Sequence, residues 1–253
     1  MTRLIAALVA LVPAAAAAQD ALPLGMRSAQ LLPGWTAEDG SRIAALELQL
    51  EPGWKTYWRS PGDSGLPPSF DWQGSTNLGE ITLHWPAPEA IQSGGMTELG
   101  YHDRLVLPFT AAPAAPGQPV QLALEAELGL CENICVPAHL QLAAPPAADG
   151  PDPRILAALA ATPQRLDDQP ACRIEQIADG LRVIIALPEA ATLAAIEVTG
   201  RDDLWISGAE IANGEAMAEL VGPEGAPFPL DPGDLRLTAI GAAGAVETTG
   251  CRL

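Results

Sequence analysis

The chain has few positive charges and, beyond its first residues, no long apolar run. Its 253 residues include 13 Lys and Arg against 31 Asp and Glu, which gives a formal net charge of −18. A surface of this sign repels phosphate backbones, so nucleic acid is not expected as a partner. No segment after the N-terminal stretch approaches the roughly 20 apolar residues that a transmembrane helix needs.

The chain also lacks the patterns that mark several enzyme classes. Ser64 stands in Gly-Asp-Ser-Gly, which some serine proteases carry, but its Pro-rich surroundings offer no context for a catalytic triad. The Gly94-Gly95 pair is not part of a phosphate-binding loop pattern. The sequence therefore indicates neither a triad hydrolase nor a nucleotide-binding enzyme.

The first residues are typical of a secretory signal. Arg3 supplies the positive region, residues 4–12 the apolar region and residues 14–18 a run of small side chains before the cleavage site. We expect cleavage between Ala18 and Gln19, which removes residues 1–18 and leaves a soluble, periplasmic chain. An uncleaved anchor is the alternative.

The four cysteines of an exported chain are expected to form two disulfides. Three pairings are possible, and the spacing favours Cys131 with Cys135 and Cys172 with Cys251. In the chain-entropy model the short ring contributes only ~2 kcal/mol to stability and the long one ~4.5 kcal/mol. We therefore interpret Cys172–Cys251 as a structural disulfide, whereas the short pair is easier to explain by chemistry.

Residues 29–142 show short strand patterns that Gly and Pro interrupt. Residues 43–50 alternate apolar and polar side chains as a half-buried strand does, and residues 54–58 continue as an aromatic strand. Residues 60–68 are rich in Pro and Gly and are expected to form a long loop. Further strands are predicted at 78–85, 105–110, 120–128 and 136–142.

A Pro- and Ala-rich segment over 143–153 is typical of a linker, and residues 154–161 are predicted to form a short helix entered through Pro153. Strand patterns return at 181–187, 195–198, 204–211, 216–221 and 235–240. Regular short strands with frequent turns indicate β-sandwiches. We therefore predict an all-β protein with a β-sandwich over 19–142, a linker with a short helix over 143–168, and a second, smaller β-sandwich-like domain over 169–253.

Residues 120–142 are predicted to form a hairpin whose tip carries Cys131 and Cys135. Gly129 favours the turn, and Pro137 prevents a helix from running on through the second strand. Strained or exposed disulfides tend to exchange, so a reversible dithiol is one hypothesis. The other is a disulfide that only staples the hairpin of a non-catalytic binding or scaffold module.

A metal site is a third hypothesis, because Cys131, Cys135 and His139 follow one another at four-residue steps. On a helix they would share a face and offer a soft site for copper or zinc, as in a protein of copper tolerance. Pro137 argues against that helix, and three ligands leave a structural zinc site incomplete. Our preferred assignment therefore has no metal.

Three motifs occur in an order and spacing similar to those of a known family: Gly53-Trp-Lys-Thr-Tyr-Trp-Arg59, Tyr101-His-Asp-Arg-Leu-Val-Leu-Pro108 and Gly129-Leu-Cys-Glu-Asn-Ile-Cys-Val-Pro137. They resemble the periplasmic N-terminal domain of the thiol:disulfide interchange protein DsbD. The Trp-Arg-x-Pro-Gly-Asp-Ser-Gly loop and the short Cys-x-x-x-Cys motif resemble its suppressor-of-copper-sensitivity branch, ScsB. The resemblance covers roughly residues 29–142.

This resemblance implies an immunoglobulin-like sandwich that passes electrons between its cysteine pair and periplasmic thioredoxin-like proteins, without a cofactor. It implies that Cys131 and Cys135 are the redox pair, one forming the mixed disulfide and the other resolving it. Tyr57 and Tyr101 match aromatic positions of the family motifs and are candidates for lining the site, with core packing as the alternative. Such a chain would be a component of a protein-disulfide reductase.

Two features depart from the family pattern. The family shields its cysteines with an aromatic cap loop, but here the corresponding stretch, 92–97, offers only Met96 as a sizeable apolar side chain. The membrane electron-transfer and thioredoxin-like domains of full-length members are also missing, so we expect a separate membrane protein or thioredoxin-like protein as partner. The sequence leaves open the direction of electron flow, the role of the second domain and which cysteine is nucleophilic, because no neighbouring cation is apparent.

Overall fold

The structure of the chain is a computed structural model that describes residues 22–188 and 191–253. The predicted signal peptide, residues 1–18, lies outside the described residues. Within them the chain is all-β apart from α1 (Pro153–Ala160) and a short 3-10 turn, η1 (Pro232–Asp234), which confirms the predicted class. None of the helices in this described part has the length and apolar character needed to cross a membrane.

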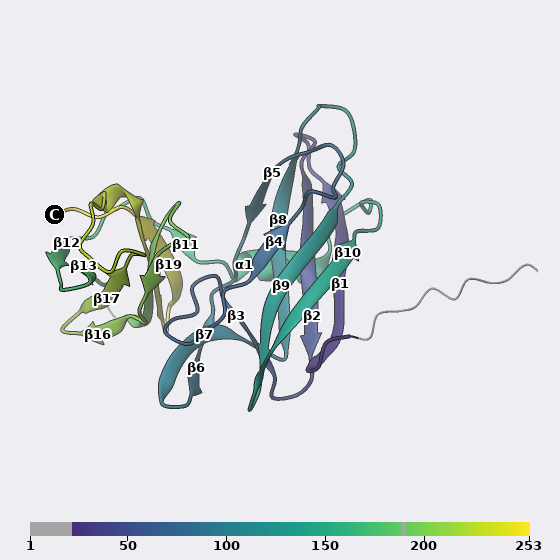
Figure 1. Cartoon of the computed structure of the whole chain (residues 1–253). Helices are drawn as coiled ribbons and strands as arrows, with labels where there is room; N and C mark the ends of the chain where they lie inside the picture. The colour runs from purple at the N-terminus through teal and green to yellow at the C-terminus, as the bar shows by residue number, and fades with distance from the viewer. Residues whose placement is uncertain (1–21, 189–190) are drawn as a thin grey trace, which may run out of the picture.

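Two sheets pack face to face and form what we call the N-terminal sandwich (Figure 1). Sheet 1 has the strand order β1-β2-β8-β5, and sheet 2 has the order β10-β9-β3-β7-β6 with β4 paired to β9. The strands of sheet 1 are β1 (Met26–Thr36), β2 (Arg42–Leu50), β8 (Arg104–Pro113) and β5 (Leu78–Leu83). Those of sheet 2 are β10 (Cys135–Ala143), β9 (Ala123–Cys131), β3 (Lys55–Tyr57), β7 (Met96–His102), β6 (Glu89–Ser93) and β4 (Ser69–Asp71).

The period-2 pattern of β9 decides which of its side chains enter the core. Its even-numbered residues, 124 to 130, are buried in the N-terminal core, where each fully buried leucine contributes about 1.5–3 kcal/mol relative to exposure. Because successive side chains of a strand point to opposite faces, Gly129 and Cys131 face away from sheet 1. This outer face of sheet 2 carries the candidate site.

Two further sheets form the C-terminal sandwich, with strand orders β11-β19-β18-β14 and β12-β13-β17-β15, and β16 paired to β17. Its strands are β11 (Gln164–Arg165), β12 (Cys172–Gln176), β13 (Gly180–Ala186), β14 (Ala191–Val198), β15 (Trp205–Ile206), β16 (Glu210–Ala212), β17 (Glu215–Val221), β18 (Leu235–Gly241) and β19 (Gly244–Thr249). The predicted strand over 204–211 is thus two short strands. The Cys172–Cys251 disulfide ties β12 to the end of the chain, with a Cα–Cα distance of 5.8 Å.

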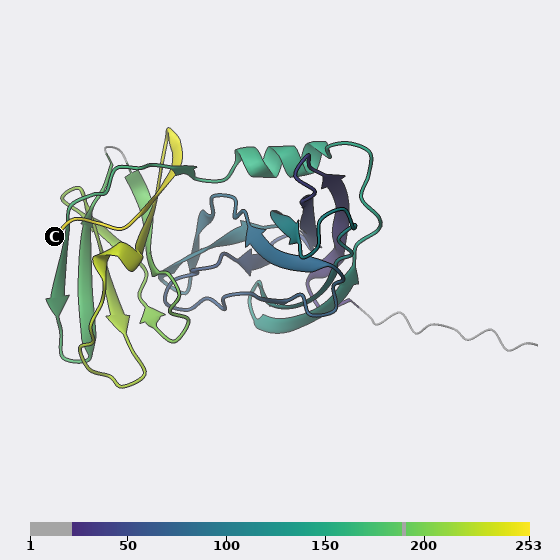
Figure 2. The same cartoon turned by 90° about the horizontal axis from the view of Figure 1, so that it is seen from above.

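The segment predicted as a linker is packed against the N-terminal sandwich (Figure 2). Asp152 caps α1 by accepting a hydrogen bond from the Arg154 backbone N–H, and Pro153 occupies the first turn, where its missing N–H has no cost. Ile155 is fully buried against Leu32 and Ala45 of sheet 1. The pairing of β11 with β19 starts the C-terminal sandwich before the predicted boundary at residue 169.

The two sandwiches share a packed interface. Ala195 of β14 is buried in the core cluster of the N-terminal sandwich, and Leu193 packs against the same cluster. Arg59, which follows β3, forms ion pairs with Glu197 and Glu247 of the C-terminal sandwich. The end of β3 is therefore fixed both within the N-terminal sandwich and by the C-terminal sandwich. This strand carries part of the candidate site.

Candidate functional site

The predicted cysteine hairpin is formed by β9 and β10. Cys131 ends β9, Cys135 begins β10, and the two are the last paired residues on either side of the loop 132–134. They form a disulfide with a Cα–Cα distance of 4.1 Å. Both disulfides that the spacing favours are therefore present.

The two half-cystines differ sharply in solvent exposure. Cys131 is only 1% exposed, because its strand is flanked by β10 on one side and by β3 on the other. Cys135 is solvent-exposed, and the neighbouring Ile134 is 61% exposed. An incoming thiolate can thus approach the disulfide from the side of Cys135.

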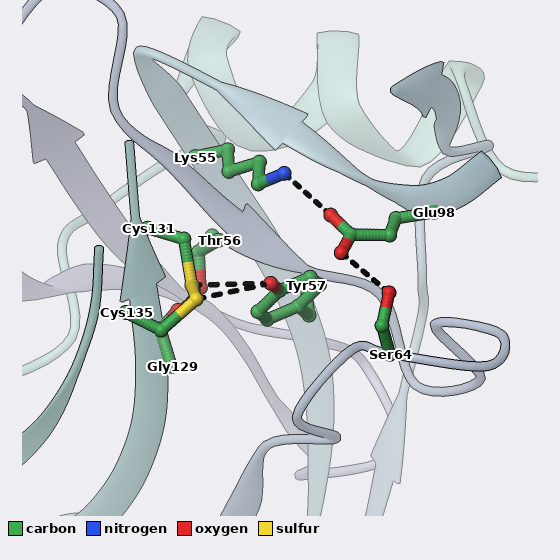
Figure 3. Close-up of a disulfide and its surroundings, with 8 residues drawn as sticks. All are labelled: Lys55, Thr56, Tyr57, Ser64, Glu98, Gly129, Cys131 and Cys135. Carbon is green, nitrogen blue, oxygen red and sulfur yellow. Dashed lines mark hydrogen bonds and ion pairs between the residues drawn. A yellow bond between two sulfur atoms is a disulfide. The ribbon is translucent and has the colours of Figure 1, made fainter. Parts of the chain in front are cut away.

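Tyr57 lies against the disulfide (Figure 3). Its hydroxyl is 3.1 Å from Cys131 Sγ and 3.6 Å from Cys135 Sγ. The ring crosses Gly129, where a Cβ atom would lie 3.1 Å from ring carbons and 2.9 Å from Leu66, so a larger residue at this position would displace the ring or the loop that carries Leu66. Burial, followed by the negative charge of Glu98, raises the pKa of Tyr57 to about 12. The hydroxyl therefore stays protonated at neutral pH and is a hydrogen-bond donor to sulfur.

A buried ion pair lies beside Tyr57. Lys55 and Glu98 are each 4% exposed, and the Lys55 ammonium contacts Glu98 Oε2. The other carboxylate oxygen accepts a hydrogen bond from Ser64 Oγ at 2.7 Å. Lys55 Nζ also lies 5.9 Å from the centre of the Tyr57 ring. Figure 3 shows Tyr57 between the disulfide and this group.

Sequence reasoning missed this polar group, which includes a cation on the strand beside the cysteine pair. Lys55 is directly opposite Cys131 in the register of β3 and β9. The sequence alone showed no cation near the cysteines, and for that reason it left open which of them is nucleophilic. The signal that could have found it is the spacing of Lys55 and Tyr57, which puts both on one face of a strand that lies beside the cysteine hairpin. Glu98 and Ser64 carry no such signal, because only the fold brings them there.

The predicted Pro- and Gly-rich loop over 60–68 covers the site. A Cβ atom on Gly65 would come within 2.9 Å of the Tyr57 ring, and one on Gly129 within 2.9 Å of Leu66. The loop is fixed by the Leu99 N–H, which donates to the Pro61 carbonyl at 3.0 Å, and by the Ser64 hydrogen bond to Glu98. This cover explains why Tyr57 is only 1% exposed on the outer face of a sheet.

The same loop is anchored on the C-terminal sandwich. The Gly208 N–H donates to Asp63 Oδ1 at 2.8 Å. At the start of the loop, Arg59 lies 2.9 Å from Glu197 Oε2 and 2.5 Å from Glu247 Oε2, and its guanidinium stacks on the Trp58 ring. Burial alone would lower the pKa of Arg59, but the hydrogen bonds and charges of the two glutamates outweigh it and raise the pKa.

The other predicted site residues lie in different surroundings. Tyr101 is buried in the core, and its hydroxyl donates to the Pro86 carbonyl at 2.7 Å. Met96 is 43% exposed after the Gly94-Gly95 turn and lines a cleft with Asp63, Gly208 and Met217. The stretch 92–97, which corresponds to the cap loop of the family but lacks its aromatic residue, is a hairpin turn, and the loop 60–68 covers Tyr57.

His139 is not brought to the sulfurs. It lies on β10 opposite Glu127, four residues beyond Cys135, which along a strand is about 13 Å. The helix on which the three-ligand copper hypothesis depended is a strand, so that hypothesis is wrong. Within residues 22–188 and 191–253, no three or more His, Cys, Asp or Glu side chains gather in a way that could hold a metal ion.

Comparison with known proteins adds a family and a fold. Residues 28–146 match the family model described as thiol:disulfide interchange protein DsbD, N-terminal. Among solved structures, the chain is similar to the N-terminal periplasmic domain of ScsB from Proteus mirabilis, with a TM-score of 0.63 and 20% sequence identity over 88% of this chain and 91% of that chain. At this identity the similarity shows a common fold. No curated protein sequence matches the chain.

Proposed function

Because residues 28–146 belong to the family of DsbD N-terminal domains, we propose that the chain is a periplasmic thiol–disulfide interchange module whose redox pair is Cys131 and Cys135. One observation carries the proposal. An exposed half-cystine, Cys135, is joined to a buried one, Cys131, whose sulfur lies 3.1 Å from the hydroxyl of a buried tyrosine. A disulfide that only stapled the hairpin would not need a donor directed at its sulfur.

The two sulfurs have different roles in the proposed reaction. A thiolate of the partner attacks Cys135 Sγ, the S–S bond breaks, and its electron pair stays on Cys131, which leaves as a thiolate. The Tyr57 O–H donates a hydrogen bond to that thiolate, and hydrogen bonds to charged acceptors are about twice as strong as those between neutral groups. The exposed Cys135 is then held in a mixed disulfide with the partner.

The second step completes a two-electron exchange. The second thiol of the partner loses its proton and attacks the partner's sulfur in the mixed disulfide, which forms the partner's own disulfide. The released Cys135 thiolate takes up one proton. The partner is oxidised, and Cys131 and Cys135 are reduced to one thiolate and one thiol. No cofactor is needed, and the reverse sequence passes electrons from this chain to an oxidised partner.

The surface next to Cys135 suits a protein partner. Ile134 precedes Cys135 in the hairpin loop and is 61% exposed, and Leu66 of the covering loop is 48% exposed. Apolar side chains that flank a reactive sulfur can pack against a partner while the sulfurs align. We therefore propose a thioredoxin-like protein, or a separate membrane electron-transfer protein, as the redox partner.

Single-cysteine variants test the proposal. We expect Cys131→Ser, which keeps the exposed thiol, to form a stable mixed disulfide with a single-cysteine thioredoxin-like protein whose thiol is activated as its thionitrobenzoate disulfide. The displaced thionitrobenzoate is the leaving group, and the product is detected by mass spectrometry. Cys135→Ser, which keeps only the buried thiol, should form at least tenfold less. In parallel, the native protein is equilibrated with glutathione redox buffers. If Cys131–Cys135 stays oxidised until the protein unfolds, the chain is a scaffold with a stapling disulfide and the proposal is refuted.

A further inference from the structure

The residue directly opposite Cys131 on β3 is a buried lysine. In a directly opposed pair the two side chains share one face of the sheet, with Cβ atoms about 5 Å apart. Lys55 is 4% exposed, and its ammonium lies beside the Tyr57 ring, whose hydroxyl reaches Cys131 Sγ. A positive charge is thus enclosed beside the tyrosine whose hydroxyl contacts the sulfur that becomes negative when the disulfide opens.

Stability does not explain this lysine. Removing an ammonium and a carboxylate from water costs several kcal/mol per ion, and replacing a buried pair by apolar side chains is often neutral or stabilising. Lys55 and Glu98 are nevertheless both enclosed, and Ser64 from the covering loop fixes the carboxylate from its other side. Two buried charges therefore lie in the region where a further charge forms during the proposed reaction.

Resting on the proposed function, we propose that Lys55 is the counter-ion of the Cys131 thiolate and that Glu98 limits how strongly it acts. When the electron pair of the S–S bond moves to Cys131, the new negative charge lies in a site from which water is nearly excluded. An ammonium on the opposed residue stabilises it, whereas the Glu98 carboxylate competes for the same ammonium and repels the thiolate. Lys55 and Glu98 are therefore positioning residues with opposite effects on Cys131.

Other charged groups around the sulfurs are more exposed. Glu132 follows Cys131 in the hairpin loop and is solvent-exposed. His102, which pairs with Lys55 on β7, is exposed and lies 2.8 Å from Glu89. Water screens both side chains, so their effect on Cys131 is weaker than that of the enclosed pair.

Because Lys55 and Glu98 should shift the Cys131 pKa in opposite directions, the shifts distinguish this proposal from a purely structural role of the pair. In a Cys135→Ser background Cys131 is the one free thiol, because Cys172 and Cys251 are joined. Its thiolate is titrated by ultraviolet absorbance. The chain has two tyrosines, and both have raised pKa values, so they ionise above the range of interest. An opposite charge within about 4–6 Å lowers a pKa by 1–3 units. The pair lies on the other side of Tyr57 from the disulfide (Figure 3), so changing one of its members should shift the Cys131 pKa by about one unit, the lower end of that range.

We expect Lys55→Met to raise the Cys131 pKa by about one unit and Glu98→Gln to lower it by about one unit, about tenfold each way in the acid constant. Glu215→Gln, which removes the same charge from an ion pair with Arg173 in the C-terminal sandwich, is the control and should leave the pKa unchanged. Shifts of equal sign, or none, overturn the proposal.

Two further measurements keep the test decisive. If one single variant does not fold, judged by circular dichroism, the sign of the Cys131 pKa shift in the other variant still tests the proposal. The double variant Lys55→Met/Glu98→Gln removes both charges, and it should return the Cys131 pKa toward its starting value. The proposed function is tested separately on the native disulfide. If that disulfide does not exchange with a partner while the opposite shifts are found, the function fails and the role of Lys55 stands.

Discussion

Replacing Tyr57 by phenylalanine tests the chemistry of the site most directly. The change removes the hydroxyl that lies 3.1 Å from Cys131 Sγ and leaves the ring that packs on Gly129. A disulfide sulfur is a weak acceptor and a thiolate a strong one, so the loss falls mainly on the reduced state. A hydrogen bond to a charged group contributes about 1.5–3 kcal/mol, which corresponds to about one to two pKa units for the Cys131 thiol.

The rate of reduction should follow this change. The leaving sulfur carries only part of its final charge in the transition state, and a thiol of higher pKa leaves more slowly. If about half of the charge has formed, Tyr57→Phe slows reduction of Cys131–Cys135 by dithiothreitol about 3- to 10-fold. The assay is the pseudo-first-order rate constant at neutral pH, with quenched samples resolved by mass spectrometry so that Cys172–Cys251 is followed separately.

Tyr101→Phe is the matched control. It also removes one buried tyrosine hydroxyl, but this hydroxyl donates to the Pro86 carbonyl in the core. We expect a lower unfolding free energy, by about 1–3 kcal/mol for the acceptor left unpaired, and an unchanged reduction rate. Equal reduction rates for Tyr57→Phe and the native protein would refute the assignment of Tyr57 as the donor to the leaving sulfur.

Two predictions concern stability. Replacing Cys172 and Cys251 by alanine should lower the unfolding free energy in denaturant titrations by about 4.5 kcal/mol, and replacing Cys131 and Cys135 should lower it by about 2 kcal/mol. The difference arises because the longer loop loses more entropy on closure. Equal losses would contradict the division into a structural and a reactive pair. Burial would raise the pKa of Glu47, but its hydrogen bonds with Arg104 and Gln30 and the charge of Arg154 lower it below the ordinary 4.5. Its contribution to stability is then complete above that value and is lost as the pH falls through the folded pKa. Glu47→Gln should therefore destabilise the protein by about 1–3 kcal/mol at pH 7 and by much less in acid, and a pH-independent difference would refute this.

The sequence predicts those parts of the molecule whose signal is local. The hairpin of β9 and β10 follows from alternating side chains on both sides of a short turn, and it places Cys131 opposite Cys135 as expected. The two disulfides follow from spacing. The loop 60–68 follows from its Pro and Gly content. In each case neighbouring residues determine the conformation, and no distant contact has to be known.

The parts that sequence reasoning missed depend on pairing between distant segments. The short strand β4 carries almost no periodic signal, and it exists because it adds to β9. The hairpin of β6 and β7 occupies the stretch that corresponds to the cap loop of the family, and its strands were not predicted. Lys55 and Glu98 are 43 residues apart in the chain and meet because β3 and β7 are neighbours in sheet 2. A single sequence does not contain the register that produces this contact.

The loop around Ser64 has a structural role that its Gly-Asp-Ser-Gly motif does not predict. Its Gly-Asp-Ser-Gly surroundings do not form a triad, yet three parts of this loop are used: Asp63 binds the C-terminal sandwich, Ser64 fixes Glu98, and Gly65 leaves room for Tyr57. The loop therefore contacts the C-terminal sandwich at Asp63 and the candidate site at the next two residues. Arg59, bound to Glu197 and Glu247, holds its beginning in the same way. Because the cover over Tyr57 is fixed by groups from β14 and β19, the C-terminal sandwich is part of the structure that keeps water away from Cys131. The enclosure of Cys131 thus depends on contacts with residues outside the segment 28–146 that matches the family model.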